Sequence, residues 1–229
     1  TGVQTCALPI FDTTSPVLII PESLEIEAQG IETEIEDFGE IIAEDISAIS
    51  SITNDAPEVF PLGETIVTWT ATDDYGNSVS NNQTIYVIDT TLPDISAPSD
   101  LRIEANHIDQ NIIDLIGVRV SDKVEISSIT NDAPEVFPLG ETIVTWTATD
   151  SSGNSASATQ TITVVDTTLP VITQPADVII DATSKLNNVI ILNPISVYDS
   201  ISDVTVTNNA PSYYEFGETI VTWTATDSS

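Results

Sequence analysis

The chain has 229 residues, of which 36 are acidic and only 4 are basic, and its formal net charge is −32. A surface with this charge repels nucleic acids and anionic lipids, because both are bound through Lys and Arg side chains, and it favours cations and cationic partners. Hydrophobic residues make up 41% of the chain, which argues against disorder, and no apolar run approaches the ~20 residues of a membrane span.

One stretch of sequence recurs at a fixed period. Gly63–Asp73, which reads GETIVTWTATD, returns as Gly140–Asp150 and again as Gly217–Asp227. Self-similarity of this kind predicts a repeat architecture. We expect three repeats, the last of them shortened at its C-terminal end: residues 11–88, 89–165 and 166–229.

The first ten residues have no counterpart at the start of the other repeats. Residues 1–10 read TGVQTCALPI and resemble a translated sequencing adapter, so we interpret them as a non-native segment. They contain Cys6, the single cysteine of the chain. Without it no disulfide can hold the fold, and the redox compartment cannot be inferred.

Each repeat begins with Asp-Thr-Thr and a short apolar segment between two prolines, residues 17–20 in the first repeat. Prolines at both ends suit an edge strand, where a missing N–H costs least. Residues 24–28 alternate between apolar and polar side chains, as a half-buried strand does. Further strands are expected at 41–43 and within 49–60, which is interrupted by a turn at Thr53–Pro57.

The recurring stretch is itself the strongest strand signal. In Gly63–Asp73 apolar and hydroxyl side chains alternate with a period of 2, so one face must be buried. We expect Val67, Trp69 and Ala71 to point inward, because Trp69 can bury the most area, and the threonine row to point outward. A turn and a last strand, residues 84–88, follow.

The predicted fold class is all-β. No segment has a sustained helical period, and about seven short strands per repeat indicate tandem antiparallel β-sandwich modules of the immunoglobulin or fibronectin type III kind. The core of each module is expected around its tryptophan, which is Trp69, Trp146 or Trp223.

A longer motif resembles the HYR (hyalin repeat) family. It is most complete from Phe137–Gly140 through Gly153–Asn154 to the closing Val165–Pro170, and the third repeat departs from it at Glu215, where proline would stand. The resemblance implies an immunoglobulin-like β-sandwich in extracellular proteins associated with adhesion. Many members have a cysteine in the middle of the recurring strand, where this chain has tryptophan, so its core must be held by packing.

Acidic residues at four positions recur with the repeat and suggest calcium, which takes six to eight oxygen ligands. These positions are Asp12/Asp89/Asp166, Glu27/Glu104/Asp181, Asp45/Asp122/Asp199 and Asp73/Asp150/Asp227. If residues 24–28 end at the same pole as the Asp-Thr-Thr linker, the ligands converge at the junctions between repeats. The expected ligands are Asp89, Glu104, Asp150 and Asn154 at one junction, and Asp166, Asp181 and Asp227 at the next. The alternative is that Asp89 and Asp150 only cap turns through the backbone.

Catalysis is not expected. The single histidine, His107, has no counterpart in the other repeats, and no nucleophile–base pair recurs. We therefore predict a non-catalytic structural or adhesive repeat region of a cell-surface or secreted protein. Two alternatives remain open. One is a module that binds a glycan or a cationic protein through exposed aromatics such as Tyr75 and Tyr213–Tyr214, and the other is an accessory region of a larger secreted enzyme.

Overall fold

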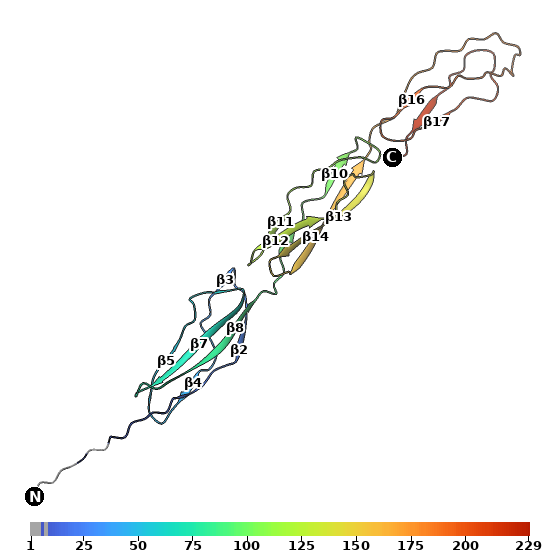
Figure 1. The fold of residues 1–229 in the computed structure, drawn as a ribbon. Coiled ribbons are helices and arrows are strands. Elements are labelled where there is room, and N and C mark those ends of the chain that lie inside the picture. The colour runs from blue at the N-terminus through green and yellow to red at the C-terminus, as the bar shows by residue number, and fades with distance from the viewer. Residues whose placement is uncertain (1–5, 7–8) are drawn as a thin grey trace, which may run out of the picture. The chain divides into compact units, whose positions relative to one another are not determined.

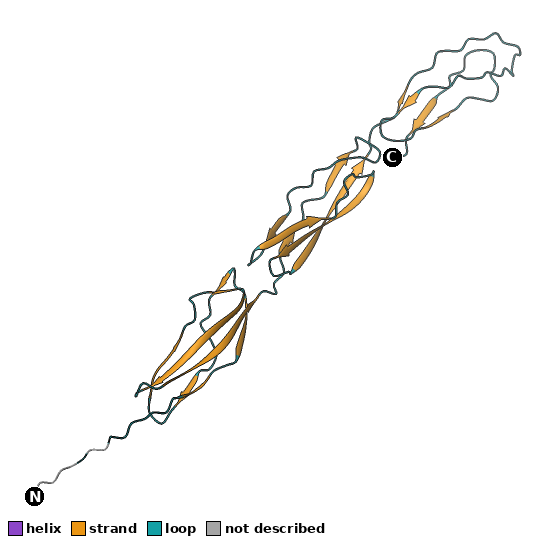
Figure 2. Cartoon of the chain, in the orientation of Figure 1, coloured by secondary structure: helices purple, strands orange, loops and turns teal. Residues whose placement is uncertain are grey.

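The computed structural model describes Cys6 and residues 9–229. Residues 1–5 and 7–8, most of the segment interpreted as non-native, lie outside this description, and that interpretation stays untested. All regular elements of the described residues are strands, and Figure 2 shows no helix among them. The chain packs as two compact units whose boundary crosses the strands of the second repeat, so each repeat is described by itself. The expected repeat boundaries stay a prediction.

The main sheet of the first repeat has four strands. In order across the sheet they are β2 (Ser23–Glu27), β8 (Ser78–Ile88), β7 (Gly63–Asp73) and β5 (Ile49–Asn54). β7 pairs antiparallel with both of its neighbours, whereas β2 runs parallel to β8 (Figure 1). β7 and β8 are the longest strands because the alternation of Gly63–Asp73 continues through the hairpin.

Two short strand pairs make the second layer of the first repeat. β1 (Val17–Ile19) pairs antiparallel with β4 (Ile42–Glu44), and β3 (Glu32–Thr33) pairs antiparallel with β6 (Phe60–Pro61). Leu18 of β1 and Phe60 of β6 are buried in the same cluster as the inward side chains of the main sheet. The two layers therefore enclose one core, as expected for a β-sandwich.

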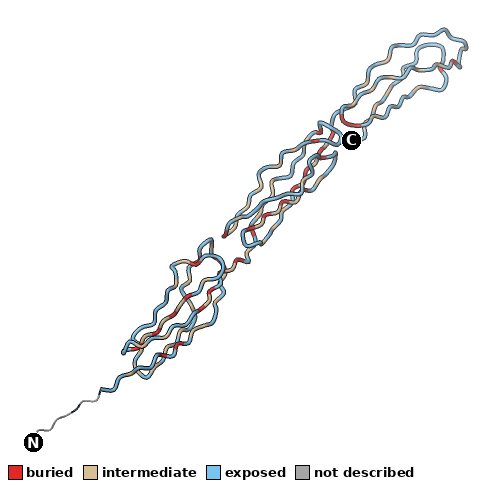
Figure 3. The backbone as a smooth tube through the Cα atoms, viewed as in Figure 1, coloured by how far each residue is buried: buried red, intermediate tan, exposed pale blue. Residues whose placement is uncertain are grey.

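The inward face of β7 is the one predicted from sequence. Val67 and Ala71 are fully buried and Trp69 is 8% exposed, while Ile85 and Val87 of β8 are buried beside them. Figure 3 shows the resulting alternation of buried and exposed positions along the strands. Phe38 packs edge-on against Trp69, with 5.6 Å between ring centroids.

The second repeat has the same main sheet. Its strands, in order, are β10 (Leu101–Glu104), β14 (Ser155–Val165), β13 (Gly140–Asp150) and β12 (Ile126–Asn131). The second layer contains the pair of β9 (Asp94–Ser96) and β11 (Arg119–Ser121). Trp146 is 5% exposed, which confirms its core position.

The third repeat has two strand pairs. β15 (Val171–Ile172) pairs with β16 (Val197–Tyr198), and β17 (Thr205–Asn208) pairs with β18 (Trp223–Thr226), both antiparallel. β18 corresponds to the central part of β7. Trp223 is only half-buried, unlike the other two tryptophans, because β17 is its one strand neighbour among the described residues.

One expectation about topology is wrong. Residues 24–28 were expected to end at the pole of the Asp-Thr-Thr linker that opens the repeat, but β2 pairs parallel with β8, with Glu27 opposite Ile88. β2 therefore ends where β8 ends, at the opposite pole from Asp73. The same holds for β10, where Glu104 lies opposite Val165.

Candidate metal centre

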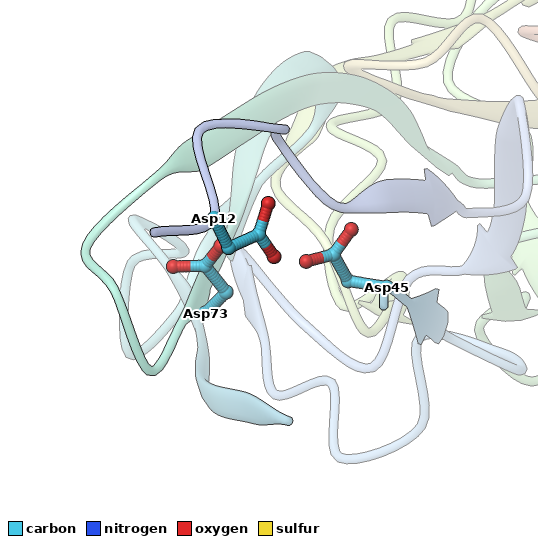
Figure 4. Close-up of side chains that lie close together, drawn as sticks. All are labelled: Asp12, Asp45 and Asp73. Carbon is cyan, nitrogen blue, oxygen red and sulfur yellow. The ribbon is translucent and has the colours of Figure 1, made fainter. Parts of the chain in front are cut away.

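The structure brings three of the four recurring acidic positions together in every repeat. The aspartate triads are Asp12, Asp45 and Asp73; Asp89, Asp122 and Asp150; and Asp166, Asp199 and Asp227. In each triad one carboxylate oxygen from each residue lies within 4.8 Å of the other two. Figure 4 shows the side chains of the first triad lying close together.

Strand pairing explains why these residues meet. β1 and β4 are antiparallel and Val17 lies opposite Glu44, so the segment before β1 and the residue after β4 share one end of the sandwich. Asp12 lies in that segment and Asp45 directly follows β4. Asp73 is the last residue of β7, and it completes the triad at the same end.

Asp73 caps the hairpin turn between β7 and β8. Its Oδ1 accepts hydrogen bonds from the amides of Tyr75, at 2.9 Å, and Asn77, at 2.8 Å. Its Oδ2 accepts from Asn77 Nδ2 at 2.8 Å. Asp150 caps the next hairpin in the same way, through the amides of Ser152 and Asn154. The turn-capping contacts of the alternative interpretation are therefore present, and they fix how these carboxylates point.

The first aspartate of each triad folds back on its own linker. Oδ1 of Asp12 accepts from the amide of Thr14 at 2.9 Å and from its hydroxyl at 2.6 Å, and Oδ1 of Asp89 accepts equally from Thr91. The second oxygen, Asp12 Oδ2, is buried and has no hydrogen-bond partner among the described residues. A buried carboxylate oxygen without a donor is costly unless a further ligand satisfies it.

Asn154 lies between the two buried carboxylates of the second triad. Its Nδ2 donates to Asp150 Oδ2 at 2.9 Å and to the Asp89 main-chain oxygen at 3.1 Å. Asn77 holds the corresponding place in the first triad. In the third triad hydroxyl groups take this part, since Ser202 and Ser229 both donate to Asp166 Oδ2.

Hydrogen bonds lower the pKa of four of the triad aspartates. The Thr14 hydroxyl and then its amide lower the pKa of Asp12 from 3.8 to about 2, and the Ser202 hydroxyl, followed by that of Thr168, lowers the pKa of Asp166 to about 2. Burial opposes the ionisation of Asp73 and Asp89, but their hydrogen bonds outweigh it and the pKa of each is lowered. These four carboxylates are therefore anionic at neutral pH, and carboxylate oxygens are ligands of the kind that calcium prefers.

A pH dependence follows from these pKa values. Because the folded pKa of Asp12 and Asp166 is about 2 and lies below the ordinary value of 3.8, their contacts stabilise the fold above about pH 4, and this stability is lost as the pH falls towards about 2. We expect the difference in thermal midpoint between wild type and the variant D12N/D166N to shrink over that window. Circular dichroism melts at constant ionic strength measure it. A difference that stays constant down to about pH 2 would contradict the assignment.

Five of the seven expected ligands lie at the triads, and the other two lie elsewhere. Asp89, Asp150 and Asn154 lie together, and so do Asp166 and Asp227. Glu104 is at the far end of its repeat, where its carboxylate accepts from the amide of Thr167 at 2.7 Å. Asp181 is exposed and outside the triads. The expected sets omitted Asp122 and Asp199, although their recurrence at the repeat period was a usable signal.

The other candidate residues lie outside the aspartate triads. His107 is exposed and its Nδ1 lies 2.9 Å from Asp109 Oδ1. Of the aromatics expected at a pole, Tyr75 and Tyr213 are exposed, whereas Tyr214 is buried. Within the described part of the chain, no helix has the length and apolar character needed to cross a membrane.

The fold and the repeated aspartate triads define a class of tandem immunoglobulin-like β-sandwich repeats. The HYR domain matches residues 88–164, which are the expected second repeat without Val165 and with Ile88 added. Hyalin of Lytechinus variegatus is 37% identical over 255 residues, which cover 99% of this chain and 47% of hyalin. Hyalin of Strongylocentrotus purpuratus is 33% identical over 254 residues, covering 100% of this chain and 21% of the relative. The chain thus contains an HYR domain at residues 88–164, and it spans less than half the length of these relatives.

Solved structures of cadherins are more distant. The Drosophila N-cadherin EC1-4 structure covers 93% of this chain and 71% of its own at 16% identity, with a TM-score of 0.35. The protocadherin GammaB4 extracellular domain covers 87% of this chain and 41% of its own at 16% identity, with a TM-score of 0.34. Similarity at this sequence identity and TM-score says nothing about the function of this chain.

Proposed function

We propose that the chain is a non-catalytic repeat region of an extracellular or cell-surface protein, and that it acts in adhesion through contacts between such repeats. The HYR domain and the similarity to hyalin over nearly the whole chain support this proposal. A strongly acidic surface opposes close approach of two such chains unless cations screen it.

We further propose that each aspartate triad binds one calcium ion. The observation that carries this is the recurrence of three convergent carboxylates in every repeat, together with the buried and unpartnered Oδ2 of Asp12. Like charges this close repel one another, and the chain has only 4 basic residues to offset them. Carboxylates, nearby main-chain oxygens and water could complete the oxygen coordination of calcium.

Calcium titration tests the metal proposal. We expect the thermal midpoint of the wild-type chain to rise with calcium, because an ion bound only by the folded state stabilises it by about 2.7 kcal/mol at a hundred times its dissociation constant. The triple variant D45N/D122N/D199N should lose this rise. Differential scanning calorimetry measures both.

A control for the loss of negative charge near the first triad is Asp74→Asn. Asp74 is exposed and adjacent in sequence to Asp73, but outside the triad, so the change removes one acidic charge from the same end of the repeat. The control should respond to calcium as wild type does. An unchanged wild-type midpoint at millimolar calcium rejects the metal sites.

Adhesion has a separate assay. Beads coated with the wild-type chain are expected to aggregate in calcium and to disperse on chelation, because calcium lowers the negative charge at the triads. Beads coated with D45N/D122N/D199N should aggregate less, and D74N beads should match wild type. Absence of aggregation by wild-type beads in calcium speaks against contacts between copies of this region.

A further inference from the structure

A glutamate at the end of β2 holds the linker that leaves the first repeat. Glu27 Oε1 accepts a hydrogen bond from the Thr90 amide at 2.8 Å, and Glu27 Oε2 accepts from the Thr90 hydroxyl at 3.0 Å. One carboxylate therefore binds both donors of one threonine. Two simultaneous hydrogen bonds restrict the orientation of that residue more than one can.

The same arrangement recurs one repeat later. Glu104 Oε1 accepts from the Thr167 amide at 2.7 Å, and Glu104 Oε2 accepts from the Thr167 hydroxyl at 2.9 Å. The four distances agree closely between the two copies, and the local sequences are also alike: LEIEA and LRIEA around the glutamates, and DTTLP at both linkers. The contact is therefore a feature of the repeat sequence itself.

The parallel pairing of β2 with β8 places the glutamate there. Glu27 lies opposite Ile88, the last residue of β8, and the ladder continues with a 2.6 Å hydrogen bond from the Ala28 amide to the Ile88 oxygen. The chain then passes directly into Asp89 and Thr90. A side chain of glutamate length at the end of β2 can thus reach the second residue of the linker.

The threonine that Glu27 binds lies between Asp89, a member of the second triad, and Thr91, which is hydrogen-bonded to Asp89. Asp89 precedes it and belongs to the second triad, while Thr91 follows it and donates two hydrogen bonds to Asp89 Oδ1. Fixing Thr90 therefore fixes the backbone that presents the Asp89 carboxylate. Thr167 has the same place between Asp166 and Thr168.

We propose that Glu27 and Glu104 are linker latches, positioning residues that orient the first aspartate of the triad in the following repeat. This inference rests on the calcium sites proposed above. It assigns the recurring glutamates a positioning role in place of the calcium-ligand role expected from the sequence. Glu27 acts on the triad of Asp89, and Glu104 acts on the triad of Asp166. Each glutamate is therefore expected to affect one triad only, so variants of Glu27 and Glu104 can be compared at both triads.

The first arm of the test needs no calcium. Amide hydrogen exchange of Thr90, followed by NMR on the full chain, should accelerate by about tenfold in Glu27→Ala, because that amide loses its acceptor. Exchange of Thr167 should stay unchanged in this variant, and the reverse should hold for Glu104→Ala. Glu27→Gln should restore protection, since its amide group offers an acceptor to the Thr90 amide and a donor to the hydroxyl.

The second arm measures calcium affinity at each triad from amide shifts. The reporters are residues that donate to a triad carboxylate, which are Tyr75, Ser152 and Ile201 for the first, second and third triads. Glu27→Ala is expected to weaken calcium binding about tenfold at the second triad alone, the loss typical of groups that orient metal ligands. Glu25→Ala is the matched control, because Glu25 is exposed on the same strand and carries the same charge.

The outcomes separate the two proposals. If wild type binds no calcium, the metal sites fail, and the exchange of Thr90 still decides whether Glu27 holds the linker. If calcium binds and Glu27→Ala weakens no site, or weakens all three equally, the positioning role is overturned. An effect of Glu25→Ala equal to that of Glu27→Ala would show that charge alone is responsible and would also overturn it.

Discussion

Replacement of Trp146 by alanine is expected to unfold the second repeat. The Trp146 side chain is buried at the centre of β13, and its Nε1 donates to Gln160 Oε1 at 3.3 Å. Gln160 in turn donates to the main-chain oxygen of Ser99 at 2.8 Å, which ties β14 to the segment before β10. Loss of a buried tryptophan costs about 3–5 kcal/mol, and the acceptor left without a donor adds to this.

The size of the module makes this loss decisive. A β-sandwich of this length buries only about 60% of the surface of its unfolded chain, so its stability is small. A cost of about 3–5 kcal/mol is comparable with the whole free energy of unfolding of a marginal domain. The second repeat therefore has little free energy of unfolding beyond this cost, and no disulfide can add to it, because the chain has a single cysteine.

Hydrogen exchange measured by mass spectrometry locates the effect. Residues 126–150 are identical to residues 49–73, so peptides from β14, whose sequence differs from that of β8, report on the second repeat. These peptides should lose protection in Trp146→Ala. Ile143→Ala is the control, because Ile143 lies on the same strand and is 61% exposed.

Trp223→Ala supplies a graded comparison. Trp223 is only half-buried, so its replacement should destabilise the third repeat less than Trp146→Ala destabilises the second. Equal effects of Trp146→Ala and Ile143→Ala would show that Trp146 is not the centre of the core.

The strands could be predicted because a period of 2 in Gly63–Asp73 fixes which side chains share a face. Alternation also predicted that Val67 and Trp69 point inward, and they do. Alternation says nothing about the partner of a strand or its direction. Residues 24–28 were therefore recognised as a strand but assigned to the wrong pole, since their parallel pairing with β8 depends on tertiary contacts.

The candidate site was predictable to a similar degree. Recurrence pointed to Asp12, Asp45 and Asp73 and their counterparts, and the structure gathers these. The same recurrence pointed equally to Glu27, which lies at the other end of the repeat and binds Thr90. Acidic residues that serve as ligands and acidic residues that hold a linker recur with the same period, so only the strand topology separates them.

Asn111 is a structural residue that the sequence analysis missed. It is buried and uses its whole amide group: Oδ1 accepts from the amides of Asn106 and His107, while Nδ2 donates to the main-chain oxygens of His107 and Phe137. Asn188 makes the same set of bonds in the third repeat. In the first repeat Thr33 pairs with Phe60 instead, so the asparagine recurs in two repeats only.

We expect Asn111→Asp to destabilise the second repeat by roughly 3 kcal/mol or more, since a buried hydrogen bond contributes about 1 kcal/mol and an unsatisfied buried group costs about 1–3 kcal/mol. The replacement preserves shape, but a carboxylate cannot donate to the oxygens of His107 and Phe137 and instead repels them. Urea unfolding followed by the β14 amides measures the change.

Asn131→Asp is the matched control, because the exposed Asn131 only accepts, from the Ala133 amide at 3.0 Å, and a carboxylate can accept that bond equally well. The two variants add the same charge to the same repeat, so general electrostatic repulsion affects both alike. A large loss confined to Asn111→Asp assigns the cost to the two donor bonds, whereas equal losses would assign it to the added charge. This matters for the metal centre as well, because Asn111 orders the end of the repeat from which Glu104 holds the linker of the third triad.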